Sequence, residues 1–210
     1  MVPMFQRKLR FFSFAFTILA FTCFGFAAHA QVAQQVLHNS DVSIGAFGQF
    51  STNVDGNGIS QTTTKSLGGE AAFRHSYHWW LGYEAGYSYT RYADYYSNQV
   101  FPVQHNMHEF SGTYLVQGPH ALGFQPFGGA GVSAVLFSPS LNGGQSVSYQ
   151  ARPGVNFTVG INHSILTSHL GVRLQYRGVY YKAPDFGEAA LTTNSFRLTS
   201  EPTAGVYFKF

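Results

Sequence analysis

Cysteine, charge and long apolar runs are all scarce in this sequence. Its 210 residues include one cysteine, Cys23, and only 10% of them are charged. A single cysteine excludes an internal disulfide framework. After residue 30, no stretch approaches the roughly 18 continuous apolar residues that a membrane-spanning helix needs, and helical periodicity is nearly absent. These absences exclude a disulfide-stapled domain and a bundle of membrane-spanning helices.

The first 30 residues have the pattern of a cleaved export signal. Residues 7–10 carry three basic side chains, residues 11–28 are apolar, and Ala28-His29-Ala30 matches the small-x-small site of signal peptidase. The alternative is a membrane-anchoring helix, since the apolar stretch is just long enough to span. The Ala-x-Ala ending and the polar segment after it favour removal. We therefore expect a signal peptide over residues 1–30 and a short periplasmic lead-in over residues 31–40.

Removal of this leader changes the charge balance. The chain has 12 lysines and arginines and nine aspartates and glutamates, and three of the basic residues lie in the leader. The remaining chain carries nine of each and has no net charge. Cys23 also lies in the leader, so no thiol nucleophile remains. This neutrality gives no reason to expect nucleic-acid binding.

What the chain does contain is glycine, aromatic residues and a hydrophobic pattern of period two. Twenty-three residues are glycine and 17% are aromatic. Apolar or small residues occupy every second position in eight segments, as expected for strands with one apolar face. The eight segments are residues 42–50, 67–73, 81–89, 110–116, 128–136, 155–161, 170–176 and 204–210.

The connections between these segments alternate in length. The long connections are residues 53–64, 91–104, 137–148 and 182–194, and the short ones are residues 75–79, 117–123 and 162–168. Outer-membrane barrels have short periplasmic turns and longer external loops, whereas a soluble sandwich has no reason to alternate so regularly. The pattern predicts an all-β fold, an eight-stranded antiparallel up-and-down transmembrane β-barrel over residues 41–210.

The opposite faces of the same segments are polar and carry both charge signs. Burying either sign alone would be costly, so compensation is expected. We expect carboxylates to face guanidinium groups inside a closed barrel whose apolar face meets lipid. The residues expected to form these interior charge pairs are Glu70, Glu84, Glu109, Arg74, Arg173 and Arg177. The alternative use of such charges is a proton or ion path.

Aromatic residues cluster where the predicted strands end. Tyr77, Trp79 and Trp80 lie at a short turn, and Tyr180 and Tyr181 lie at the end of the seventh segment. Amphipathic rings settle at the headgroup level of a membrane, which predicts two interfacial girdles. The alternative is ordinary aromatic packing in a core.

The closing residues, Thr203–Phe210, resemble the C-terminal signal of outer-membrane barrels, with Gly205, Phe208 and Phe210 at its key positions. The chain as a whole resembles the small eight-stranded outer-membrane barrel family, and is similar to the membrane domain of OmpA and to OmpX. The resemblance implies a location in the outer membrane and contact with its lipid and lipopolysaccharide. It also implies transient recognition of the last strand by the barrel-assembly machinery. We expect a monomer that binds no nucleic acid.

Some barrels of this class are lipid A-modifying enzymes, which makes histidine and serine worth a search. His105 and His108 lie near one end of the fourth segment. Their spacing places them on opposite faces of a strand. The pairs His163-Ser164 and Ser168-His169 fall on a short turn, at the end of the barrel away from lipid A. We therefore expect no catalytic triad and no enzyme.

The sequence also lacks the pattern of a metal or cofactor site. Residues Asn53–Gly58 partly copy a calcium-binding loop, but Thr64 stands where the bidentate glutamate is required. A surface loop rich in Asp-Gly and Asn-Gly explains the segment. No cofactor and no metal are expected.

Four functions stay open at this point. The favoured one is a non-enzymatic outer-membrane protein that supports envelope integrity and displays loops for external contacts. The others are a lipid A-modifying enzyme, a narrow porin-like channel and a secreted soluble β-sandwich.

Overall fold

The computed structural model describes residues 37–140, 147–165 and 169–210. Residues from Asn39 to Phe210 form one unit. The expected signal peptide lies outside the described residues, as does most of the expected lead-in. The first strand begins at Ser40, one residue before the expected start of the barrel.

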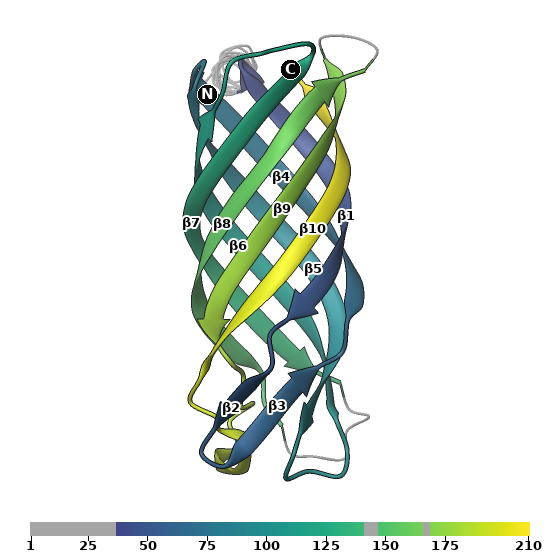
Figure 1. Ribbon diagram of the computed structural model, residues 1–210, viewed down its shortest axis with the longest axis vertical. Helices are drawn as coiled ribbons and strands as arrows, with labels where there is room; N and C mark the ends of the chain where they lie inside the picture. The colour runs from purple at the N-terminus through teal and green to yellow at the C-terminus, as the bar shows by residue number, and fades with distance from the viewer. Residues whose placement is uncertain (1–36, 141–146, 166–168) are drawn as a thin grey trace, which may run out of the picture. The chain divides into compact units, whose positions relative to one another are not determined.

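Eight long strands make up the barrel, and a short hairpin extends it at one end (Figure 1). The barrel strands are β1 (Ser40–Ser51), β4 (Ser66–His78), β5 (Leu81–Tyr96), β6 (Val103–Gln117), β7 (Phe124–Pro139), β8 (Gln150–Ser164), β9 (Leu170–Lys182) and β10 (Phe196–Lys209). The hairpin strands are β2 (Val54–Gly56) and β3 (Ile59–Thr63), and a 3-10 helix, η2 (Ala189–Leu191), lies between β9 and β10. Among the described residues, no helix has the length and apolarity to cross a membrane.

Backbone pairing closes the eight strands into a ring. Each barrel strand pairs antiparallel with its two neighbours, and the ring closes where β1 pairs with β10. At this closure Ala46 lies opposite Ala204. Closure satisfies the backbone groups that an open edge would leave unpaired in hydrocarbon. The predicted fold, an eight-stranded antiparallel barrel, is confirmed.

The two ends of the barrel differ, and we name them here. The loop end carries the β2–β3 hairpin and the β5–β6, β7–β8 and β9–β10 connections, and it lies at the bottom of Figure 1. The turn end carries the β4–β5, β6–β7 and β8–β9 connections, together with the start of β1 and the end of β10.

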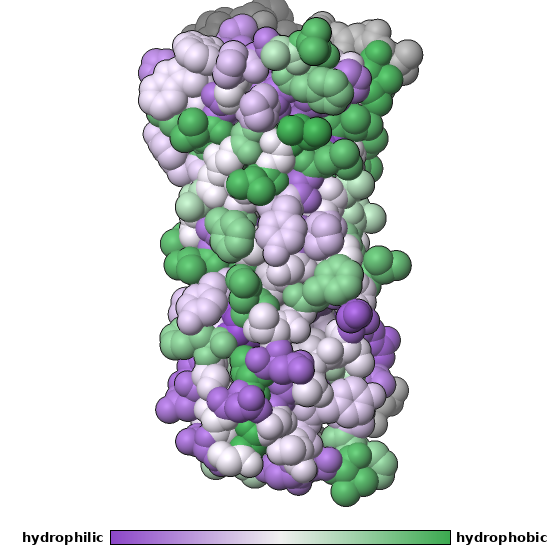
Figure 2. Space-filling view, viewed as in Figure 1, coloured by the Kyte–Doolittle hydropathy of each residue, from purple (hydrophilic) through white to green (hydrophobic). Residues whose placement is uncertain are grey.

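The apolar side chains face outward and the polar ones inward, as the alternation predicts. Ile44 is 66% exposed and Tyr83, Val132 and Phe208 are also exposed, whereas Glu109 is wholly buried. Figure 2 shows apolar and weakly polar side chains along the middle of the visible face, with strongly hydrophilic ones gathered toward the loop end. A soluble barrel has the reverse arrangement, so the outer surface is suited to lipid.

Residues 53–64 connect the barrel strands β1 and β4, as predicted, and they contain the β2–β3 hairpin. The predicted connection over residues 91–104 is too long, because most of it belongs to β5 and β6, which leaves 97–102 as the connection. The alternation in fact continues past residue 89, since Tyr92, Asp94 and Tyr96 are buried. The strands therefore extend beyond the apolar band, where inward side chains still pack but outward ones need not be hydrophobic.

Candidate functional site

The interior of the barrel holds the charged side chains, and the first ion pair lies between β4 and β5. Arg74 and Glu84 are opposite each other in the ladder, and Arg74 Nη2 lies 2.7 Å from Glu84 Oε2. Both side chains are buried. The Arg74 guanidinium also stacks over the Phe127 ring, 4.1 Å from its centroid. Phe127 therefore covers part of the cation with an aromatic ring.

A second pair lies nearer the turn end. Arg173 Nη2 is 2.8 Å from Asp41 Oδ1, and its Nη1 is 3.8 Å from Glu84 Oε2. The same guanidinium donates to Asn162 Oδ1 and Ser43 Oγ at 2.9 Å each. Arg173 thus joins four strands through one planar donor group, the geometry for which arginine is suited.

Arg177 is the centre of a third group, and it serves three carboxylates. Its Nη1 lies 3.2 Å from both Glu70 Oε2 and Glu201 Oε2, and its Nη2 lies 2.9 Å from Glu109 Oε1. Ser133 donates to Glu109 at 2.6 Å. The carboxylate of Glu201 is wholly buried and accepts no hydrogen bond from the described residues, so its ion pair with Arg177 is its main contact.

All six residues that the sequence placed in the interior are in these three groups. Asp41 and Glu201 join them, although neither is among the predicted pairing residues. Both could have been found, because each lies on the inward face of its strand by simple alternation. The resulting cluster has five carboxylates against three guanidinium groups, and burial makes each unpaired charge costly.

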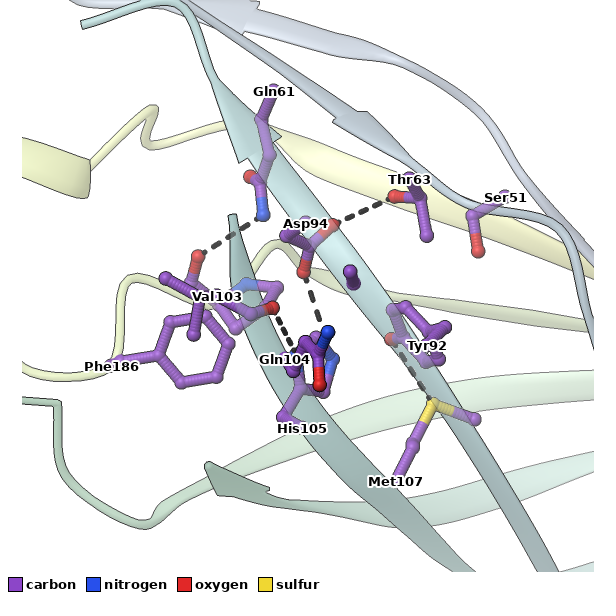
Figure 3. Close-up of polar contacts among 12 residues, drawn as sticks. Ser51, Gln61, Thr63, Tyr92, Asp94, Val103, Gln104, His105, Met107 and Phe186 are labelled. Carbon is purple, nitrogen blue, oxygen red and sulfur yellow. Dashed lines mark hydrogen bonds and ion pairs between the residues drawn. The ribbon is translucent and has the colours of Figure 1, made fainter. Parts of the chain in front are cut away.

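A separate ion pair lies at the loop end. Arg197 Nη1 is 2.9 Å from Asp94 Oδ1, and both side chains are fully buried. Thr63 donates to Asp94 Oδ1 at 2.8 Å, and His105 Nε2 lies 3.7 Å from Asp94 Oδ2. Figure 3 shows Asp94 between Thr63 and His105, with Phe186 beside the imidazole. The predicted strands leave this group out, because the third one ends before Asp94 and the last one begins after Arg197.

An apolar cluster fills the lumen around this pair. Its buried members are Tyr92, Tyr96, Val103, Met107, Val135, Phe137, Val179, Tyr181, Phe186 and Leu191. Two of them, Phe186 and Leu191, come from the β9–β10 connection, which therefore folds back into the barrel. The His105 ring lies 4.2 Å from the Tyr92 ring centroid and 5.0 Å from that of Phe186. The loop end is thus occupied by packed side chains.

Hydrogen bonds hold the connections of the loop end against one another. Tyr96 Oη donates to the Pro184 carbonyl at 2.9 Å and accepts from Gln61 Nε2 at 2.8 Å. Asn57 donates to the Thr192 carbonyl at 2.8 Å. The β2–β3 hairpin is therefore tied to the β9–β10 connection. These contacts make a cap of fixed shape from segments far apart in the sequence.

Asp185 anchors the β9–β10 connection to β8. Its carboxylate lies 2.9 Å from Arg152 Nη2 and accepts from Gln150 Nε2 at 2.6 Å. The Gly187 amide donates to it at 3.1 Å. Burial tends to raise the pKa of Asp185, but the bonds from Gln150, Gly187 and Arg152 outweigh it and hold the pKa below its usual value.

The turn end is hollow and polar. Two adjoining cavities of about 310 and 230 Å³ lie there. Their shared lining consists of amide, hydroxyl, imidazole and ammonium side chains from Asn39, Ser76, Gln117, His120, Gln125 and Lys209. Asp41, the partner of Arg173, lines the smaller cavity. The charge cluster therefore begins where the hollow ends.

The histidines considered as catalytic bases have other partners. His105 is buried inside the barrel, whereas His108 faces outward and its Nδ1 lies 2.8 Å from Tyr87 Oη. His163 Nδ1 lies 3.1 Å from the Gly123 carbonyl oxygen, and Ser164 lies 3.3 Å from Tyr207 Oη. Ser168 lies outside the described residues. In the described part of the chain, no group of three or more His, Cys, Asp or Glu side chains could hold a metal ion.

The three key positions of the closing residues lie at the barrel closure. Gly205 is opposite Gly45 of β1, and a Cβ added there would lie 2.5 Å from the Ile44 carbonyl oxygen. Phe208 and Phe210 face outward, 47% and 43% exposed, with ring centroids 5.5 Å apart. Glycine is thus required by the close approach of the first and last strands.

The closed sheet, its apolar exterior and its ion-paired interior define a transmembrane β-barrel. The sequence pattern of the family described as "Outer membrane protein beta-barrel domain" matches residues 16–200. This chain belongs to that family. No curated protein sequence matches the chain.

Solved structures share the fold at low sequence identity. Neisserial surface protein A is 19% identical, with 82% of this chain and 97% of that chain covered and a TM-score of 0.58. The outer membrane protein OprG from Pseudomonas aeruginosa is 16% identical, with 82% and 96% covered and a TM-score of 0.55. These similarities concern the fold alone.

Proposed function

We propose that this outer-membrane β-barrel protein is non-enzymatic, supports envelope integrity and presents the cap of the loop end to the exterior. One observation carries the proposal: the lumen is filled over most of its length by buried, partnered side chains. The Arg177 group fills the middle, and the cluster around Phe186 fills the loop end. An eight-stranded barrel is only wide enough for its own side chains.

The proposed orientation places the loop end outside the cell and the turn end in the periplasm. It assumes that residues 1–30 direct export and are removed. The long connections and the fixed cap of the loop end support this choice, because external loops are the longer ones in such barrels. Outer-membrane lipid and lipopolysaccharide are the proposed surroundings, and the assembly machinery is a transient partner through Gly205, Phe208 and Phe210.

The two alternative functions receive less support. A channel needs a path past Arg177, whose guanidinium is held by three carboxylates from three strands. An enzyme needs a nucleophile next to a base, whereas His105 is enclosed by aromatic rings and His108 is bonded to Tyr87. The fixed cap instead suits a surface that contacts other molecules without changing them.

Cell fractionation combined with planar-bilayer conductance tests the proposal. We expect the protein in the outer-membrane fraction with heat-dependent gel migration, and we expect bilayers that contain the refolded protein to show no stable open level. A stable open level would support the channel, and a periplasmic location would support a soluble protein. A lipid A mass profile that changes with expression, and reverts when His108 is replaced by alanine, would support the enzyme.

A further inference from the structure

The charged side chains in the middle of the barrel form two groups that differ in their charge balance. Toward the turn end, two guanidinium groups face two carboxylates, in the residues Arg74, Arg173, Glu84 and Asp41. The second group, which we call the Arg177 group, sets the Arg177 guanidinium against the carboxylates of Glu70, Glu109 and Glu201. The first group is balanced. The Arg177 group has two negative charges in excess when all of its carboxylates are ionised.

This excess charge is buried. Glu109 and Glu201 are wholly buried, and the side chains of Arg177 and Glu70 are each 8% exposed. An ion without a partner is costly to bury, so the group needs a further positive charge. In the part of the chain that the structure describes, no group of three or more His, Cys, Asp or Glu side chains could hold a metal ion. A proton is the cation that fits, because carboxylates that share a buried site cannot all ionise.

The charged groups that face Glu201 come from three other strands. They are Arg177 of β9, Glu70 of β4 and Glu109 of β6, which all converge on the Arg177 guanidinium. The remaining strands bring no charge to this level of the lumen. Their inward residues beside the group are Gln49 of β1, Ser88 of β5, Ser133 of β7 and Thr158 of β8.

Two of the three carboxylates are stabilised in their ionised form by hydrogen bonds. Glu70 accepts from Gln175 Nε2 at 2.6 Å and from Arg177 Nη1 at 3.2 Å. Glu109 accepts from Ser133 Oγ at 2.6 Å and from Arg177 Nη2 at 2.9 Å. Hydrogen bonds donated to a carboxylate favour the charged form. The proton is therefore disfavoured on Glu70 and Glu109.

Glu201 differs from these two carboxylates. Both of its oxygens are buried, and neither accepts a hydrogen bond from the described residues. Its Oε2 lies 3.2 Å from Arg177 Nη1, whereas its Oε1 is in no ion pair of the described residues. A proton on Oε1 leaves Oε2 facing the guanidinium. It also replaces an unpaired charge by a hydroxyl, which is much less costly to bury.

We propose that the barrel interior is a proton-binding site, in which the Glu201 carboxyl holds one proton on Oε1 at neutral pH. The bound proton halves the excess negative charge around Arg177. At alkaline pH the proton passes to water, the second excess charge returns and the strands around Arg177 repel one another. The interior is thus a pH-sensitive element of the fold. The inference does not depend on the orientation of the barrel or on its proposed function.

Infrared spectroscopy of the refolded, full-length mature protein in vesicles tests where the proton lies. A protonated carboxyl has a carbonyl band that is separate from the bands of carboxylates, and glutamate labelled with carbon-13 in its side-chain carboxyl identifies the residue type. We expect this band in the original protein at pH 7 and its absence in Glu201→Gln. Glu188→Gln is the matched control and is expected to keep the band, since Glu188 lies next to η2 and is in no ion pair of the described residues.

The pH dependence of stability gives a second, independent measurement. A glutamate of the unfolded chain ionises at about pH 4.3. Above this pH the folded barrel binds more protons than the unfolded chain, so its stability falls as the pH rises. We expect the unfolding equilibrium constant of the original protein to rise relative to that of Glu201→Gln, by at most about tenfold per pH unit. The rise begins near pH 5 and ends where the infrared band disappears. Glu188→Gln is expected to follow the original protein.

Four results would overturn the inference. The first is the absence of a protonated glutamate band from the original protein at pH 7. The second is a band that persists in Glu201→Gln, which would place the proton on another carboxyl. The third is the same pH dependence of unfolding in the original protein and in Glu201→Gln. The fourth is a stability that changes when sodium is replaced by choline at constant ionic strength, which would indicate a bound metal cation. If Glu201→Gln does not fold, the labelled original protein still shows whether the band exists and disappears at alkaline pH.

Discussion

Arg177 and Glu201 lie opposite each other on β9 and β10, with Nη1 3.2 Å from Oε2 at the centre of the barrel. Glu70 from the far side of the lumen approaches the same nitrogen at the same distance. The Arg177 guanidinium therefore links strands that are not neighbours, across the interior of the barrel.

Replacement of Arg177 by Gln is expected to destabilise the barrel strongly. It leaves Glu70, Glu109 and Glu201 buried together without a cation, and removal of one partner from a buried ion pair costs roughly 3–5 kcal/mol. Chemical denaturation in vesicles, followed by gel migration, measures the change. Glu201→Gln is the control, because it removes one of three competing carboxylates and is expected to cost much less. A smaller effect for Arg177→Gln than for Glu201→Gln would contradict the assigned role.

Replacement of Phe186 by Ala is expected to loosen the cap. Phe186 is wholly buried against His105 and Phe137, and deletion of a buried phenyl ring typically costs about 3–5 kcal/mol. Here we expect the loss to fall mainly on the β9–β10 connection, which then becomes sensitive to proteases added at the loop end. Val100→Ala is the control, since Val100 is 89% exposed. Unchanged protease resistance in Phe186→Ala would show that the ring does not hold the connection.

The anchoring of the same connection is expected to depend on pH through Asp185. The pKa of Asp185 is lower in the folded protein than in the unfolded chain. Its contribution to the stability of the folded connection is therefore fully present above the ordinary carboxyl pKa. That contribution is lost as the pH falls through the lower, folded value. We expect amide protection around Gly187, corrected for intrinsic exchange rates, to hold from neutral pH down to about 4 and then to decrease. In Asp185→Asn the protection is expected to be lower at neutral pH and nearly independent of pH.

Replacement of Gly205 by Ala is expected to impair closure of the barrel. The added Cβ would lie 2.5 Å from the Ile44 carbonyl oxygen and 2.9 Å from Gly45 Cα, both of them backbone atoms of β1. Gly112→Ala is the matched control, because a Cβ there meets nothing within 4 Å. Refolding yield into vesicles measures both. Equal yields would mean that the strand pair adjusts, and that glycine in this position serves only recognition of the last strand.

The sequence and the structure agree best where local alternation decides the outcome. The outward and inward faces follow from period two, which is why Tyr83 is exposed and Glu84 buried. Agreement fails where the predicted strand was stopped too soon. Asp94 keeps the alternation of Glu84, but the polar and tyrosine-rich sequence around it has the composition of a loop.

The burial of Phe186 and the contacts of the cap have no signature in the local sequence. Phe186 lies in a connection between strands, at a positive φ of 52°, and its burial depends on how that connection folds back into the lumen. The cap contacts, such as Asn57 to Thr192, join residues 135 positions apart. Such contacts form only after the ends of four strands have been brought together.

The amino-acid sequence by itself determines the strands, their two faces and the charge types that must share the interior, because side chains alternate along any extended chain. Only the tertiary structure decides which carboxylate meets which guanidinium. The stagger of the closed sheet sets the height of each inward side chain, so Arg177 reaches Glu109 across 68 positions of sequence.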